Sequence, residues 1–98
     1  MEVEVNTLPV EKILEVASSF GATRVRVFGS WARGEATGDS DLDLIVDFPR
    51  GTTLLDLAGL QIELEKILGI KVEVLTEGDL HPRLKDQILA EARPLVAA

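Results

Sequence analysis

Several features are scarce or absent in this 98-residue chain, and each scarcity excludes a class of protein. There is no cysteine, so a disulfide framework, a thiolate zinc site and a cysteine nucleophile are excluded. Basic residues are outnumbered, with 10 Lys plus Arg against 17 Asp plus Glu, and the net charge of −7 disfavours a general nucleic-acid binder because most of the surface would repel phosphate. No apolar run approaches membrane-spanning length, and the N-terminus lacks a basic region followed by an apolar stretch. We therefore expect a cytoplasmic protein with no membrane partner.

Glycine and proline do not cluster: they stand singly between periodic segments rather than forming a linker. The length and the 46% hydrophobic composition suit one compact domain over residues 1–98. Hydrophobic periodicity and turn residues predict six elements in chain order. These are a helix at 9–20 behind Thr7 as N-cap, strands at 23–28 and 41–48, a helix from Thr52 or Thr53 to Gly69, a strand at 70–76, and a helix after Pro82.

Interspersed helices and strands of this kind predict an α/β or α+β fold, with a small mixed sheet backed by helices on one face. In the strand at 41–48, Leu42, Leu44 and Val46 alternate with Asp41, Asp43, Ile45 and Asp47. In the later helices, we expect apolar stripes that include Leu54, Leu57, Leu64 and Ile67, and then Leu84, Ile88 and Leu89. The sheet face that carries the aspartates is then free to hold a site.

A turn after the strand at 23–28 has features that suit phosphate. Gly29 lets the backbone bend sharply and approach a ligand, and Ser30 offers a hydroxyl and an N–H at the expected start of a short helix. Arg33 could steady triphosphate charge as a bidentate donor, or it could pair with Glu35 or Asp39 and brace the loop.

Three acidic residues are expected to face the same way on the sheet. Asp41 and Asp43 are two residues apart on one strand, so their carboxylates leave the same face with Cα atoms about 6.6 Å apart. Glu73 alternates with Val72 and Val74 and points to that same face. Three such acids repel one another unless a cation binds, and carboxylate, phosphate and water oxygens are the ligands that Mg²⁺ prefers.

At these residues the chain resembles the minimal nucleotidyltransferases of the DNA polymerase β superfamily, whose signature is Gly-Ser, ten residues, Asp-x-Asp and a third acid on a later strand. Gly29, Ser30, Asp41 and Asp43 match that spacing, and the likeness continues through Glu91. The resemblance implies the superfamily's fold and a Mg²⁺-dependent transfer of a nucleoside monophosphate, with Mn²⁺ as an alternative metal. The donor would be ATP or another nucleoside triphosphate, and the acceptor would be a hydroxyl. It also implies that Asp41, Asp43 and Glu73 are catalytic and hold metal, although Glu73 stands where close relatives usually have Asp.

The resemblance implies a partner as well. Larger members of the superfamily bind the acceptor with an added helical domain, so we expect the acceptor of this chain to arrive on another molecule. Stand-alone members point to an antitoxin paired with a HEPN-type toxin ribonuclease, whose basic surface would suit the charge of −7. Leu89, Leu95 and Val96 could extend the contact surface, and self-association is an alternative. Two rival functions are a silent binding module that blocks its toxin by contact alone and a small-molecule adenylyltransferase of the aminoglycoside type.

Other polar and aromatic residues have simpler interpretations. Ser40 is expected to orient its turn, and His81 to cap a helix rather than bind metal. Trp31 is more simply explained by core or lid packing than by stacking on a nucleobase. Arg24 and Arg26 are expected to compensate charge on the sheet face.

Overall fold

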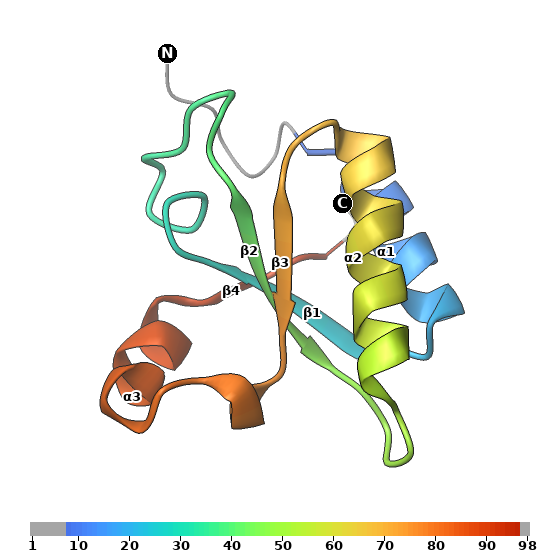
Figure 1. Ribbon diagram of the computed structural model, residues 1–98. Coiled ribbons are helices and arrows are strands. Elements are labelled where there is room, and N and C mark those ends of the chain that lie inside the picture. Colours follow the sequence, from blue (N-terminus) through green and yellow to red (C-terminus); the bar gives the residue numbers. More distant parts are fainter. Residues whose placement is uncertain (1–7, 97–98) are drawn as a thin grey trace.

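The computed structural model describes residues 8–96 (Figure 1). The helices are α1 (Val10–Ser19), α2 (Leu54–Leu68) and α3 (Pro82–Glu91), and η2 (Glu77–Asp79) is a short 3-10 turn. The strands are β1 (Arg24–Phe28), β2 (Leu42–Asp47), β3 (Val72–Leu75) and β4 (Arg93–Pro94). All six expected elements are present, whereas η2 and β4 are too short for a periodic pattern to reveal. Thr7, the expected cap of α1, lies outside the described residues.

The four strands form one mixed sheet in the order β3-β2-β1-β4. Strand β2 pairs antiparallel with β1 and parallel with β3, and β4 pairs antiparallel with β1. The edge position of β4 tolerates Pro94, which has no N–H to donate to a further strand. The α+β class with a small mixed sheet is therefore confirmed.

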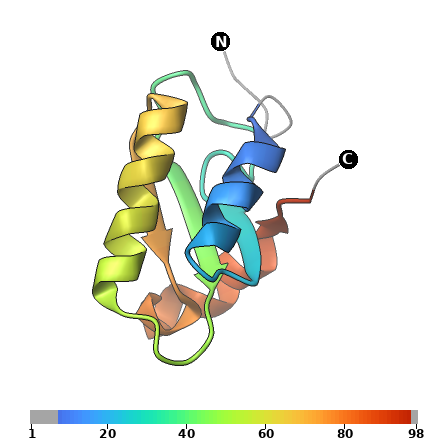
Figure 2. The ribbon, with the colours of Figure 1, turned by 90° about the vertical axis from the view of Figure 1, so that its right-hand side faces the viewer.

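Helices α1 and α2 lie side by side on one face of the sheet, and apolar side chains fill the space between the two layers (Figure 2). Alternate positions of the strands point into this core because successive side chains leave opposite faces. The fully or almost fully buried members include Ile13, Ala17, Val25, Val27, Leu42, Leu44, Val46, Leu60, Leu64 and Val72.

Helix α2 has well-defined ends, and its buried stripe only partly matches the expected one. The Thr53 hydroxyl accepts from the Asp56 N–H, the Asp56 carboxylate accepts from the Thr53 N–H, and Gly69 ends the helix in the left-handed conformation. Leu60 and Leu64 are buried and Leu57 packs against the core, whereas Leu54 is 81% exposed. Apolar residues occur on several sides of this helix, so periodicity alone could not identify the side that faces the sheet.

The opposite face of the sheet is partly covered, in contrast to the open face that alternation suggested. Ile45 is fully buried there, and Leu80, which follows η2, is 6% exposed. Figures 1 and 2 show α3 on this side, away from α1 and α2. Helix α3 has no fully buried residue: Leu84 is half exposed, while Ile88 and Leu89 are partly buried, so the expected apolar stripe of this helix is only partly covered.

The C-terminal segment packs onto the sheet. Leu95 is 5% exposed and its N–H donates to the Val25 carbonyl over 2.9 Å, whereas Val96 is 70% exposed. Leu95 is therefore a core residue, and its expected role on a partner surface is wrong.

Candidate active site

The turn that follows β1 is a tight backbone loop rather than a helix. Gly29 has a φ of +72°, which glycine adopts at little cost. The Arg33 N–H donates to the Gly29 carbonyl over 3.1 Å, and the Glu35 N–H donates to the Ser30 carbonyl over 2.9 Å. The short helix expected after Ser30 is absent from this part of the described chain, because turns occupy residues 29–34.

The turn lies directly against Asp43 on the neighbouring strand. Phe28 is the register partner of Asp43 across the β1–β2 pair. A Cβ atom placed on Gly29 would overlap Oδ2 of Asp43. Glycine therefore allows the backbone of the turn and the carboxylate to occupy adjacent space.

The three acidic residues predicted from the sequence gather at the same end of the sheet. Asp43 and Glu73 are direct neighbours in the parallel register of β2 and β3. Asp41 precedes β2 by one residue and is exposed, as is Glu73, while Asp43 is partly buried. Because β3 is an edge strand, Glu73 is open to an approaching molecule.

This clustering changes the acidity of Asp43. Burial raises the pKa of Asp43 to about 6, and the negative charges of Glu73 and Asp41 add to the rise. Arg33 acts in the opposite direction and lowers it. The site thus carries an excess of negative charge that a bound cation would relieve.

The oxygen ligands of the cluster fit a hard divalent cation. Across residues 8–96, no three His, Cys, Asp or Glu side chains converge as a complete metal-binding group. A Mg²⁺ ion commonly keeps several waters and binds through one or two carboxylates together with substrate phosphates. An open carboxylate cluster of this kind fits that mode of binding better than an all-protein cage.

Arg33 lies beside the acidic cluster and is held by two carboxylates. Its Nε donates to Glu35 and its Nη1 donates to Glu91, each over 3.1 Å. The hydrogen bond to Glu35 and the charge of Glu91 raise the pKa of Arg33, so the guanidinium remains charged. Of the two expected loop partners, Glu35 pairs with Arg33, whereas the second carboxylate comes from Glu91 on α3 rather than from Asp39.

Glu91 is the residue of this region to which the sequence had assigned no role. It also accepts a hydrogen bond from the Gly29 N–H over 2.9 Å. The two residues are 62 positions apart, and no local pattern links them. The sequence contains one indication that Glu91 belongs to the site, namely that the likeness to the minimal nucleotidyltransferases continues through this residue.

The remaining singled-out residues have structural roles. The Ser40 hydroxyl accepts from the Thr37 N–H over 2.8 Å, and Nδ1 of His81 accepts from the Arg83 N–H at the start of α3. Trp31 is 5% exposed and packs in the core, so its ring is not available to a nucleobase. These findings confirm the simpler interpretations of all three side chains.

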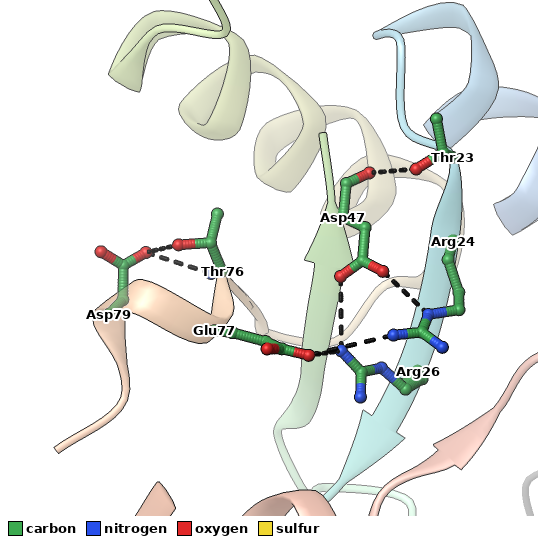
Figure 3. A network of polar contacts seen from close by, with 7 residues as sticks. All are labelled: Thr23, Arg24, Arg26, Asp47, Thr76, Glu77 and Asp79. Atoms are coloured by element: carbon green, nitrogen blue, oxygen red, sulfur yellow. Dashed lines mark hydrogen bonds and ion pairs between the residues drawn. The ribbon is translucent and has the colours of Figure 1, made fainter. Parts of the chain in front are cut away.

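Arg24 and Arg26 form a separate ion-pair network at the far end of β2 (Figure 3). Arg24 donates to Asp47 over 2.8 Å, and Arg26 donates to Asp47 over 3.3 Å and to Glu77 over 2.5 Å. The expected charge compensation is therefore present, but its acids are not those of the candidate site. A cavity of about 470 Å³ adjoins this network and is lined in part by Asp47, Arg50 and Glu77.

Within residues 8–96, every helix lacks the length and apolar character needed to cross a bilayer.

The fold and the acid-lined turn define a domain of the nucleotidyl-transfer class, and comparison with known proteins agrees. The pattern of the nucleotidyltransferase domain family matches residues 10–95. A Methanocaldococcus jannaschii protein named as a candidate protein adenylyltransferase is 48% identical over 81 residues, which cover 83% of this chain and 87% of the relative. The protein adenylyltransferase MntA of Thermococcus cleftensis is 38% identical over 77 residues, covering 79% and 78%.

Solved structures give the same result. A structure described as a candidate minimal nucleotidyltransferase is 52% identical, with a TM-score of 0.82 over 95% of this chain and 97% of that one. More distant chains share the fold at 19% and 17% identity, with TM-scores of 0.78 and 0.71; they cover 93% and 96% of this chain, and 75% and 74% of their own. The first is a toxin–antitoxin with AMP-PNP, and the second a tri-AMPylated HEPN toxin of Shewanella oneidensis in complex with an MNT antitoxin.

The chain belongs to the nucleotidyltransferase domain family, as a domain of the minimal nucleotidyltransferase type. It is a nucleotidyltransferase enzyme.

Proposed function

We propose that this enzyme transfers AMP from ATP to a hydroxyl group of a HEPN-type toxin and acts as the antitoxin of that partner. The observation that carries the proposal is the meeting of the turn at Gly29 with Asp43 and Glu73 at one end of the sheet. A close backbone turn and a carboxylate cluster are the two parts that nucleotidyl transfer requires, one for the phosphates and one for the metal.

The turn supplies the phosphate-binding groups. Ser30 offers its hydroxyl and backbone N–H, and the charged guanidinium of Arg33 can donate to phosphate oxygens. Gly29 keeps this turn against Asp43. The triphosphate then lies where its α-phosphorus is close to the acidic cluster.

Asp41, Asp43 and Glu73 would hold Mg²⁺, with Mn²⁺ as a substitute. The raised pKa of Asp43 supports this assignment, because a cation favours the ionised carboxylate that burial and Glu73 disfavour. When bound, Mg²⁺ supplies positive charge that offsets the charge of the triphosphate and of the leaving group.

In the transfer step, the acceptor hydroxyl oxygen forms a bond to the α-phosphorus of ATP. The bond from that phosphorus to the oxygen bridging to the β-phosphate breaks, and pyrophosphate leaves with the electron pair. The hydroxyl proton passes to a carboxylate of the cluster. Glu73 is our candidate base because it is exposed on an edge strand, where an acceptor on another molecule can reach it.

Three further observations support a protein acceptor. The curated relatives are named as protein adenylyltransferases, and the distant structural neighbours include an AMPylated HEPN toxin with an MNT antitoxin. The net charge of −7 would favour association with a basic surface.

The proposed partner is a helical, basic protein that we expect to be encoded beside this chain, and the test is to incubate the two purified proteins in the presence of Mg²⁺ and ATP. We expect intact-mass spectrometry to detect whole AMP units on the partner with wild-type protein and none with Asp43→Asn. Asp47→Asn is the matched control, because Asp47 lies on the same strand and the same face but belongs to the distant ion-pair network. This control should still modify the partner.

The same experiment separates the rival functions. Complex formation should survive Asp43→Asn, because one neutralised carboxylate leaves most of the interface intact. If wild type and Asp43→Asn neutralise the toxin equally and neither modifies it, the proposal is wrong and contact alone neutralises the partner. If AMP instead appears on a small-molecule hydroxyl and never on the partner, the acceptor assignment is wrong.

A further inference from the structure

One carboxylate on α3 connects two parts of the turn at the candidate site. Oε1 of Glu91 accepts from the Gly29 N–H over 2.9 Å and from Nη1 of Arg33 over 3.1 Å. The Glu91 side chain is 24% exposed, compared with 46% for Arg33. The acceptor is therefore more sheltered from water than the cation that it binds.

The first of these bonds sets the orientation of the peptide group at Gly29. That residue has a positive φ and lies against Oδ2 of Asp43. A rotation of its peptide group would move the turn relative to the carboxylate. Glu91 thus helps to maintain the spacing between the phosphate-binding turn and the acidic cluster.

The second bond restricts a long, flexible side chain. An arginine side chain has many rotamers and therefore loses conformational entropy when it is ordered. Glu91 holds Nη1 while Glu35 holds Nε, so the plane of the guanidinium of Arg33 is defined before any ligand arrives. Nη2 has no hydrogen-bond partner among residues 8–96 and can donate to a phosphate oxygen.

Three backbone donors that follow Gly29 in the turn have no partner among residues 8–96. No acceptor within the described part of the chain binds the backbone N–H groups of Ser30, Trp31 or Ala32. The Glu91 carboxylate therefore binds one backbone N–H and leaves the next three N–H groups free to bind a ligand. This arrangement lets Glu91 support the turn without blocking it.

We propose that Glu91 is a positioning residue for triphosphate binding, acting through Gly29 and Arg33. This role rests on the proposed function of the turn as the triphosphate site. Because Glu91 itself need not touch the nucleotide, its loss should weaken binding of the β- and γ-phosphates and leave a monophosphate almost unaffected.

The test compares calorimetric titrations of Mg²⁺ with ATP and of AMP on wild type and Glu91→Gln. We expect Glu91→Gln to weaken ATP binding about five- to tenfold, with AMP changed less than about twofold. In the transfer reaction, KM for ATP should rise by a similar factor while kcat stays within about twofold. Glu91→Asp keeps the charge but is shorter by one methylene group, so we expect an intermediate loss.

Glu65→Gln is the matched control, because the Glu65 carboxylate on α2 also anchors a strand N–H, that of Val72, over 3.0 Å. It should alter thermal stability without changing the ratio of ATP to AMP affinity. Circular dichroism would verify that each variant is folded.

Three results would overturn the role of Glu91. Equal losses for ATP and AMP would make it a structural tie only, and tighter ATP binding by Glu91→Gln would make the carboxylate a competitor of the phosphates. If wild type binds ATP and modifies its partner while Glu91→Gln behaves identically, the role of Glu91 alone is wrong. If wild type binds no triphosphate, the proposed function fails as well.

Discussion

Asp43 is partly buried beside two other carboxylates, and this makes its protonation part of the stability of the fold. The folded protein keeps a proton on this carboxyl between its ordinary pKa of 3.8 and the raised value of about 6, whereas the unfolded chain has already lost it. The folded state binds more protons in that interval. The free energy of unfolding contributed by Asp43 therefore falls as the pH rises from 3.8 to about 6 and is level above it.

We expect Asp43→Asn to be more stable than wild type at about pH 7.5 in the presence of EDTA, because it removes the ionised group that burial and Glu73 disfavour. The gain should shrink toward about pH 4, where wild-type Asp43 is itself protonated. Urea unfolding at the two pH values measures both effects. Asp39→Asn, an exposed change in the preceding loop, serves as the control. A wild type more stable than Asp43→Asn at the higher pH would contradict the electrostatic interpretation.

At the scale of elements, the turn at residues 29–34 and the strand β2 act as one unit. Gly29 and Gly34 have almost the same φ, +72° and +73°, but only Gly29 has a neighbour within 4 Å of an added Cβ, the carboxylate of Asp43. Substituting Gly34 therefore tests backbone strain alone, whereas substituting Gly29 tests backbone strain together with steric contact at the site.

We predict that Gly34→Ala lowers the free energy of unfolding by about 1 kcal/mol, the cost of a left-handed conformation for a residue with a Cβ. Gly29→Ala carries the same strain and must also displace Asp43, so we expect a loss greater by about 1 kcal/mol or more. Urea denaturation of the two variants at neutral pH gives the comparison. Equal losses would mean that the turn can move away from Asp43 without cost.

At the scale of the whole molecule, one end of the sheet carries the candidate site and the other end carries an ion-pair network. The acidic cluster and the turn at Gly29 lie at one end of β2, and the ion pairs of Arg24 and Arg26 lie at the other (Figure 3). Asp43 and Asp47 are four residues apart on β2, about 13 Å along the strand. Stability and nucleotide binding should therefore respond to different substitutions.

We predict that Asp47→Ala lowers the free energy of unfolding by about 1–2 kcal/mol, because Arg26 is largely buried and loses one of its two partners. Affinity for ATP with Mg²⁺ should stay within about twofold at temperatures where the variant is folded. Glu63→Ala, which breaks an exposed pair with Lys66, should cost less than about 0.5 kcal/mol. Thermal melts and titrations of the three proteins would make the test, and a large loss of ATP affinity in Asp47→Ala would show that the two ends are coupled.

Short-range features of this protein could be predicted from its sequence, because they depend on the covalent spacing of residues. Alternation with a period of two identified β1, β2 and β3, and capping residues placed α2 between Thr53 and Gly69. The same alternation put Asp43 and Glu73 on one face, and the parallel register makes them neighbours. The Gly-Ser turn followed by Asp-x-Asp was sufficient to indicate the family.

The tertiary structure decided what depends on contacts between distant segments. Periodicity could not show that α3 packs on the side opposite α1 and α2, that Ile45 is buried there beside the acids, or that Leu95 joins the core. Periodicity also could not predict the hydrogen bond between Glu91 and Gly29, which are 62 positions apart. These contacts are set by how the layers pack and by which polar groups must find partners, and neither condition is expressed in the spacing of neighbouring residues.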